Sequence, residues 1–310
     1  MKSINTLFFA ILLAVSVTNC QQAPQPKETT ITAVSTDFPE LLDRNAALHN
    51  GKEWETVQNR YVALRNTIQK ENEAEARIKM AHLFINEARV TGEHGHYYPA
   101  ALATLAEIPA DHPDQDIRFR KLATRASVEL SLHDFQQALQ TAEAAVKLNP
   151  YNAQIYGALV DANVELGNYE AAVAMADKMV SIRPDMRSYA RVAYLREIHG
   201  QVDGAFEAMQ LAVDAGYPGY EATAWARLTL AEMYERYGQK EAAKQTCQRI
   251  LAERPGYPFA IAALANLEAE SGNYEKAEQM LEEACEAIPE FGFYEQLADI
   301  YKSTGREAAF

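Results

Sequence analysis

The sequence predicts an all-α fold, a solenoid of antiparallel helix pairs, from a repeated unit, a repeated glycine and a repeated small residue. Units of 34 residues, with one of 37, each end in proline, at Pro150, Pro184, Pro218, Pro255 and Pro289. A fixed period in this range is typical of stacked repeats, in which each helical hairpin buries its apolar face against its neighbours.

Residue types also recur at fixed columns inside each unit. Glycine is expected at the turn between the two helices, because it adopts the left-handed conformation that lets the chain reverse. Small residues allow the two helices to approach closely, and proline cannot continue the second helix. The turn column holds Gly167, Gly200, Gly238, Gly272 and Gly305, with His133 in the first copy, and the small column holds Ala138, Ala172, Ala205, Ala243 and Ala277.

These columns make residues 117–310 resemble the tetratricopeptide repeat (TPR) family. The copy at 153–184 carries the family's residues at Tyr156, Leu159, Gly167, Tyr169, Ala172 and Pro184, and the copy at 258–289 carries them at Leu264, Ala265, Gly272, Tyr274, Ala277 and Pro289. The resemblance implies a right-handed superhelix whose first helices line a concave groove for a peptide or protein. Val202 and Lys240 depart from the pattern, which has an aromatic residue after the turn.

The last unit is predicted to be incomplete. Residues 294–304 supply a first helix, and only five residues follow the turn at Gly305. Arrays of this kind usually close with a capping helix. The sequence leaves three alternatives open: the segment frays, something else covers it, or the chain is a fragment.

Residues 38–116 are predicted to be a divergent start of the same solenoid. We expect a short helix over 38–49, an amphipathic helix over 54–70, and a degenerate repeat with helices over 73–89 and 99–108. The nine residues between the last two helices form an insertion that an ordinary repeat lacks, and we expect a loop there.

This insertion contains the residues that suggest metal chemistry. Glu93, His94 and His96 are close in sequence, and His82 lies on the preceding helix. Imidazole and carboxylate groups are zinc ligands. A His-x-His pair on a loop without a fixed fourth ligand is more simply a structural or binding loop. His94 and His96 are therefore weak metal candidates, and we expect no cofactor.

The N-terminus is predicted to be a secretory signal. Lys2 precedes an apolar run, residues 7–17, which is too short to span a bilayer. The tetrapeptide Val-Thr-Asn-Cys that ends at Cys20 resembles the lipobox of bacterial lipoproteins, although asparagine is unusual before the cysteine. The resemblance implies a signal peptide over 1–19 and lipidation of Cys20. An ordinary signal peptide with an incidental cysteine is the alternative.

Residues 20–37 are polar, contain prolines and lack a helical period, so we expect a flexible linker. With a lipid at Cys20, the array would be anchored in the cell envelope. Gln21 favours the outer membrane by the rule known for enteric bacteria. The side of the membrane and the oligomeric state stay open.

The composition argues against several classes of function. The chain has 43 acidic and 29 basic residues, a formal net charge of −14, and no basic patch is visible in the sequence. This argues against nucleic acid as a partner. The sequence contains no His-Glu-x-x-His, no Gly-x-Ser-x-Gly and no phosphate-binding glycine loop, so we do not expect an enzyme. Cys247 and Cys285 are expected to be small buried packing residues, too far apart for a disulfide.

We therefore expect a non-catalytic interaction scaffold that holds a peptide or protein partner in its groove. By the family's geometry, the groove-facing residues include Gln154, Asp161, Arg187, Arg191, Tyr194, Trp225, Glu232, Asn266 and Asp299. Arg187, Arg191 and Tyr194 together suit a carboxylate or an acidic peptide, because arginine offers paired hydrogen bonds. In the other interpretation, these arginines pair with acids on adjacent helices.

Two other functions stay open. One is a metal- or small-ligand-binding envelope protein that uses the 93–98 loop. The other is a non-catalytic subunit of an envelope enzyme or transport complex.

Overall fold

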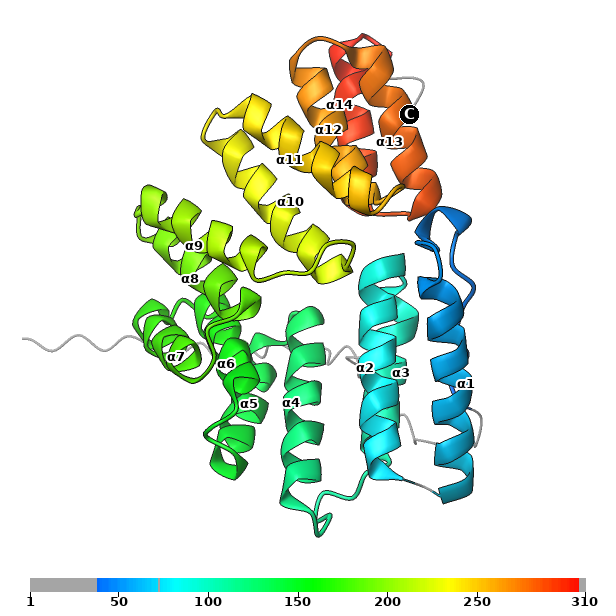
Figure 1. Cartoon of the computed structure of the whole chain (residues 1–310), viewed down its shortest axis with the longest axis vertical. Helices are drawn as coiled ribbons and strands as arrows, with labels where there is room; N and C mark the ends of the chain where they lie inside the picture. The colour runs from blue at the N-terminus through cyan, green and yellow to red at the C-terminus, as the bar shows by residue number, and fades with distance from the viewer. Residues whose placement is uncertain (1–37, 72, 307–310) are drawn as a thin grey trace, which may run out of the picture. The chain divides into compact units, whose positions relative to one another are not determined.

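The computed structural model describes residues 38–71 and 73–306, which are built of helices (Figure 1). Fourteen α-helices and one short 3-10 helix, η1, make up these described residues, which contain no strand. The prediction of an all-α fold is confirmed. No helix in this part of the chain is both long enough and apolar enough to cross a membrane. The predicted signal peptide, Cys20 and the linker lie outside the described residues.

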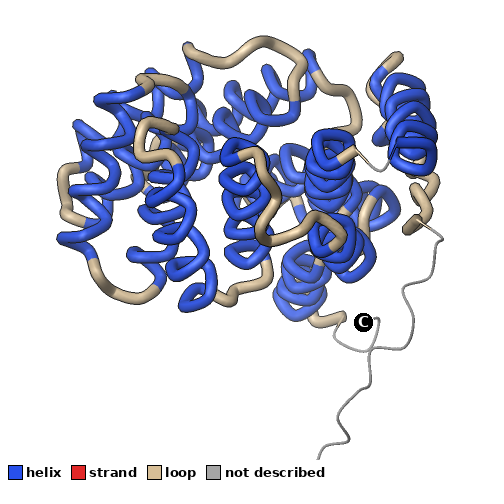
Figure 2. The backbone as a smooth tube through the Cα atoms, turned by 90° about the horizontal axis from the view of Figure 1, so that it is seen from below, coloured by secondary structure: helices blue, strands red, loops and turns tan. Residues whose placement is uncertain are grey.

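Each helix packs against the next along the chain, and the first helices of most successive pairs also touch. Figure 2 shows that short loops join the helices. The elements are η1 (Ala46–Leu48), α1 (Glu53–Glu71), α2 (Ala74–Thr91), α3 (His94–Ala106), α4 (Gln115–Ser131), α5 (Phe135–Leu148), α6 (Ala153–Glu165), α7 (Tyr169–Ile182), α8 (Met186–Ile198), α9 (Val202–Asp214), α10 (Glu221–Arg236), α11 (Lys240–Glu253), α12 (Pro258–Glu270), α13 (Tyr274–Ala287) and α14 (Phe291–Ser303).

The repeated columns lie at the turns and crossings that the sequence predicts. Gly167 has a φ of +78° just after α6, and His133 adopts the same left-handed conformation, with φ +60°, in the copy that lacks the glycine. The small residues after the turns are at most 1% exposed; they are Ala138, Ala172, Ala205, Ala243 and Ala277. A larger side chain there would push the paired helices apart.

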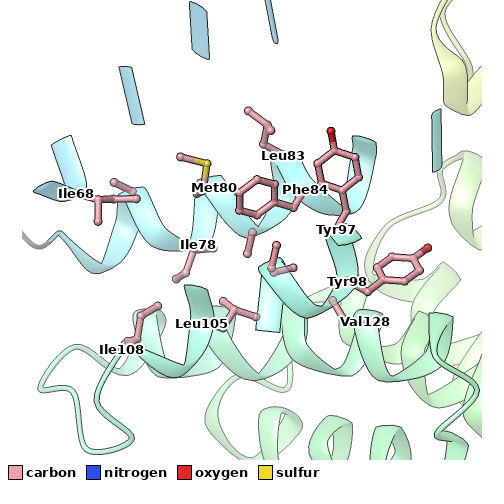
Figure 3. Close-up of a cluster of buried hydrophobic side chains, with 14 of the residues drawn as sticks. Ile68, Ile78, Met80, Leu83, Phe84, Tyr97, Tyr98, Leu105, Ile108 and Val128 are labelled. Carbon is pink, nitrogen blue, oxygen red and sulfur yellow. The ribbon is translucent and has the colours of Figure 1, made fainter. Parts of the chain in front are cut away.

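The insertion in the degenerate repeat is helical, so the prediction of a loop is wrong. Helix α2 continues to Thr91 and α3 begins at His94, which leaves a turn of two residues. Gly92 makes this turn with φ +73°. Tyr97 and Tyr98 explain the difference, because both are almost fully buried and Tyr97 stacks on Phe84 of α2 at 5.9 Å (Figure 3). Burial of these rings stabilises the added first turn of α3.

The prediction of a helix over residues 38–49 is also wrong, because only the single turn of η1 is helical there. The segment runs instead over α2 and α3. Tyr97 Oη accepts a hydrogen bond from the Leu42 backbone N–H at 3.0 Å, and the ring of His96 meets the Glu40 carbonyl at 2.8 Å. We name residues 38–52 the strap, because they continue from there to the far repeats.

Arg44 fixes the strap on α2. Its guanidinium donates to both carboxylate oxygens of Glu87 at 2.6 and 2.7 Å, and both side chains are 1% exposed. It also donates to Glu53 of α1 at 2.9 Å. Glu53 accepts in turn from Arg254, which follows α11, at 2.7 Å. The shared carboxylate of Glu53 thus joins two buried arginines that are 210 positions apart in sequence.

The strap also contacts the last repeats directly. The Asn45 side chain donates to the Glu286 carbonyl of α13 at 2.7 Å, and Leu48 is buried in the apolar cluster of α12, α13 and α14. Ala47 lies against Gly256, where a Cβ would come within 3.0 Å of the Ala47 carbonyl oxygen. In Figure 1 this dark blue segment lies beside the orange α13. The strap therefore joins both ends of the described repeats.

The first helix of the last unit is covered. Phe293, Leu297 and Ile300 of α14 are buried in one cluster with residues of α12 and α13. The exposed residues of α14 include Glu295 and Asp299, but also Phe291 and Tyr294, which are 77% and 39% exposed. Within the described residues, α14 therefore packs on the preceding pair through one face and leaves two aromatic rings open on the other.

Candidate functional site

A cavity of about 470 Å³, open on one side, lies between α1 and the first helices of the pairs. Helices α1 and α2 form one wall, with Arg60, His82 and Arg89, and helices α4, α6, α8 and α10 complete it. Five of the predicted groove residues line the cavity: Gln154, Asp161, Arg187, Arg191 and Trp225. Their placement on these inner helices agrees with the expected geometry, and their role in partner binding stays a prediction.

Arg191 is held by an acid on the adjacent helix. It donates to both carboxylate oxygens of Asp161, from Nε at 2.8 Å and from Nη2 at 2.5 Å. It also donates to the Gly157 carbonyl at 3.2 Å. Gly157 makes this possible, because a Cβ there would lie 3.1 Å from the guanidinium carbon. For Arg191 the structure therefore follows the second of the two interpretations, in which arginine pairs with a neighbouring carboxylate.

Arg187 differs from Arg191. Within the described residues no carboxylate lies within ion-pair distance of its guanidinium, and the side chain projects into the cavity. Burial lowers its pKa, and the positive charges of Arg191 and Arg89 lower it further, against an opposing effect of Asp185. Arg187 thus lines the cavity as an exposed residue that forms no ion pair with a described carboxylate.

Two further cavity arginines were not among the predicted site residues. Arg60 of α1 has no ion-pair partner among the described residues, and Arg89 of α2 reaches Glu221 only at 3.7 Å. Four arginines and a single carboxylate line the cavity. The sequence shows no basic patch because these arginines come from three separate helices, α1, α2 and α8, which the fold brings together.

The sequence itself indicates that three of the cavity residues on α2 share one face of the helix. His82, Asn86 and Arg89 are spaced by four and three residues, which places them on one face of a helix. The residues of this degenerate repeat do not match the family's columns, so the pattern alone does not place this face on the cavity. Nothing in the sequence of α1 indicates that Arg60 faces the array.

His82 lies on the same wall, and the positive charges of the nearby arginines affect its pKa. Its Nε2 is 2.9 Å from the Thr124 hydroxyl. Burial lowers the pKa of His82, and the charges of Arg120, Arg60 and Arg187 lower it further. The imidazole is therefore held in its neutral form at neutral pH.

The remaining predicted groove residues lie elsewhere. Tyr194 is 48% exposed and does not line the cavity, so it does not join Arg187 and Arg191 in one grip. Asn266 and Asp299 line a second hollow of about 220 Å³ between α12, α13 and α14. Asn266 donates to Glu235. Burial raises the pKa of Glu232, which lines neither space.

The weak metal candidates are used for packing. His94 stacks on Tyr98 at 5.2 Å, and His96 is bound to the strap. No group of three or more histidine, cysteine or acidic side chains with metal-binding geometry occurs within residues 38–71 and 73–306.

The two described cysteines are free thiols. Cys247 is buried in α11, as expected, and burial raises its pKa to about 12. Cys285 in α13 is only partly buried, which corrects the expectation that both are core residues.

Family models described as tetratricopeptide repeat match residues 129–197 and 260–291. The small glutamine-rich tetratricopeptide repeat-containing protein 2 of Saccharomyces cerevisiae is 27% identical over 108 residues, which are 34% of this chain and 31% of the yeast protein. This chain therefore spans less than a third of that relative.

Solved structures share the fold at low identity. A chain of the APC/C hetero-tetramer Cut9–Hcn1 matches with a TM-score of 0.61 at 14% identity, over 82% of this chain and 48% of that chain. A tetratricopeptide repeat protein from Parabacteroides merdae matches with a TM-score of 0.57 at 14% identity, over 82% and 95%. Such repeats generally mediate protein–protein interaction. Residues 129–197 and 260–291 of this chain therefore match tetratricopeptide repeats, and the described residues share the helical fold of such proteins.

Proposed function

We propose that the protein is a non-catalytic scaffold that binds a segment of a protein partner in the cavity lined by α1, α2, α4, α6, α8 and α10. The cavity itself carries the proposal. It measures about 470 Å³, within the range of roughly 300–1,000 Å³ typical of ligand sites. It lies on the first helices of the repeats, where the family's groove is expected.

The side chains that line the cavity would contact an extended peptide segment of a partner more fully than they would contact a flat protein surface. Trp225 and Met186 offer apolar contact, and Gln154 and Asn86 offer hydrogen bonds to a peptide backbone. Trp225 is 39% exposed, so a large part of its ring is open to contact. A side chain or short peptide that enters the cavity would bury this ring and gain its hydrophobic contribution.

Site-specific photo-cross-linking in the native cell tests the proposal. A photoreactive residue replaces Gln154 in the cavity, and in a matched variant it replaces Gln140, an exposed glutamine on the outer helix α5. We expect a defined partner to be captured from position 154 and not from position 140. Capture of the same partner from position 140 alone would reject the cavity as the binding site.

The N-terminus suggests where this binding takes place. We infer from residues 1–37 that the scaffold is a lipoprotein of the bacterial cell envelope, held through Cys20 by a linker of 17 residues. Mass spectrometry of the mature N-terminal peptide tests this, with a diacylated or triacylated Cys20 as the expected product. A peptide with an unmodified cysteine, or an uncleaved signal, would contradict it.

A further inference from the structure

We propose that a third hollow, between α9, α10 and α11, binds a small organic carboxylate at the guanidinium of Arg227. Helices α9 and α11 are the second helices of two neighbouring pairs, and this hollow shares no lining residue with the cavity of the proposed function. The inference is therefore independent of that function. The hollow measures about 330 Å³, within the range of roughly 300–1,000 Å³ typical of ligand sites.

Arg227 is almost fully buried, at 5% exposed, but only part of its guanidinium is bound. Nη1 donates to Glu253 at the end of α11. Nε is buried and has no hydrogen-bond acceptor among the described residues, and Nη2 has none there either. These two atoms form the edge of the guanidinium that can hold both oxygens of one carboxylate. A buried donor without an acceptor is unfavourable, so a ligand oxygen at this edge would stabilise the arginine.

Two other arginines of this chain show what binds to that edge. Nε and Nη2 of Arg44 donate to the two oxygens of Glu87 at 2.7 and 2.6 Å. The same two atoms of Arg191 donate to Asp161 at 2.8 and 2.5 Å. In both cases the carboxylate comes from a different element of the fold. Arg227 is buried as deeply as Arg44 but lines a hollow at this point, so we infer that its second carboxylate belongs to a ligand.

The connection between α9 and α10 positions Arg227. This connection, residues 215–220, has six residues, whereas the connections before α6, α8, α12 and α14 have three or four. Within it, Gly219 donates its N–H to Glu253 at 3.1 Å. Glu253 therefore binds both the connection and Nη1 of Arg227. Because Glu253 is bound on both sides, Nε and Nη2 are left for another acceptor.

The other lining side chains suit a carboxylate that carries an apolar body. Val213 and Leu230 are buried and offer apolar contact, and the half-buried ring of Tyr234 lies beside them. Arg249 lines the hollow with a side chain that is 68% exposed and lies 3.6 Å from Glu253, so it adds attraction for an anion but little fixed contact. An inorganic anion would leave the apolar residues uncovered, so an organic carboxylate fits this lining better.

The test is a titration of the full chain with para-fluorophenylacetate, followed by fluorine nuclear magnetic resonance. The amide para-fluorophenylacetamide has the same shape without the charge and is the control ligand. We expect saturable binding of the acid and no saturation with the amide, because only the carboxylate can accept from both donors of Arg227. Absence of saturation by the acid, or equal binding of both compounds, would overturn the inference. Saturation by inorganic phosphate alone would also overturn it.

Substitutions test whether the probe binds in this hollow. Arg227→Gln should weaken the affinity at least about tenfold, the size of a hydrogen-bonded charge contact. Because this change also removes a partner of Glu253, a second variant leaves every ion pair in place: Ala242→Phe puts a ring into the hollow and should abolish binding. Ala171→Phe is the matched control, since Ala171 is the third residue of α7 as Ala242 is of α11, but does not line the hollow. Unchanged affinity in Ala242→Phe, or in Arg227→Gln with its fold intact by circular dichroism, would overturn the proposal.

The Nε–H signal of Arg227 gives a readout that a purely structural role would not change. This signal should shift on titration with para-fluorophenylacetate, whereas that of Arg44, which is already bonded to Glu87, should stay in place. Saturation of the protein without a shift at Arg227 would place the probe elsewhere and reject the inference. A shift at Arg227 in a protein that captures no partner from position 154 would support the inference and reject only the proposed function.

Discussion

The repeats and the strap hold the molecule together by different kinds of contact. In the repeats, small apolar residues at regular spacing bury the seams between neighbouring helices, as Ala172 and Ala205 do. In the strap, single polar contacts join distant parts of the chain. Glu53, which binds Arg44 of the strap, also binds Arg254, 201 positions away, and Asn45 of the strap binds Glu286, 241 positions away.

The strap contacts join the two ends of the described repeats, which contacts between neighbouring repeats cannot do. A solenoid ordinarily contacts only its neighbours, so its repeats open and close locally. The strap adds contacts between the first and the last repeats, and these contacts resist such opening. Because α1, which carries Arg60, begins where the strap ends, the strap also fixes one wall of the cavity.

The largest expected effect comes from breaking the strap at its buried ion pair. Glu87→Ala leaves the charge of Arg44 buried without its main partner, which should lower the free energy of unfolding by about 3–5 kcal/mol. Urea unfolding followed by circular dichroism measures it. The double variant Arg44→Met/Glu87→Leu should recover most of the loss. A loss below about 1 kcal/mol would show that the strap contributes little.

Alanine substitutions at two glycines compare the strap contact with an ordinary turn between repeat helices. Gly256 and Gly272 have nearly equal φ values, +79° and +83°, but only Gly256 lies against the strap. Gly272→Ala should cost about 1 kcal/mol from the left-handed backbone alone. Gly256→Ala should cost about 2 kcal/mol, because its Cβ also meets the Ala47 carbonyl oxygen. Equal melting temperatures for the two variants would argue against a close strap contact.

The strap should also be sensitive to acid. Burial alone would raise the pKa of Glu53, but hydrogen bonds from Arg254, Asn50 and Arg44 outweigh it and lower this pKa below its usual 4.5. The stabilisation is therefore complete above pH 4.5 and is lost as the pH falls through the lower, folded-state pKa. Amide hydrogen exchange of residues 38–53 should quicken in this range in the wild type. It should not change with pH in this way in Glu53→Gln.

The smallest effect is expected from an exposed ion pair between repeats. Arg236 contacts Glu197 at 3.0 Å, and its side chain is 50% exposed. Arg236→Ala should change the free energy of unfolding by at most about 1 kcal/mol, because water screens the pair. A loss comparable to that of Glu87→Ala would remove the contrast between buried strap contacts and exposed repeat contacts.

The sequence predicted the repeats well because their packing is periodic. The columns through Gly167 and Ala172 repeat at a fixed step, so each copy supports the others. The strap has no such period: Arg44, Glu53 and Arg254 are single charged residues, and nothing in their spacing indicates that they meet. The same limit applies to the site, where Arg187 lay on a recognisable column but Arg60 did not.

Hydrogen exchange of the Glu53→Gln variant tests the central claim most directly, because Glu53 is the carboxylate shared by Arg44 and Arg254. If the strap closes the array, protection should fall in residues 38–52 and also in residues 253–258 and 284–290, while helices α6 and α7 keep theirs. Loss of protection confined to residues 38–52 would contradict the claim, because the last repeats would then be stable without the strap.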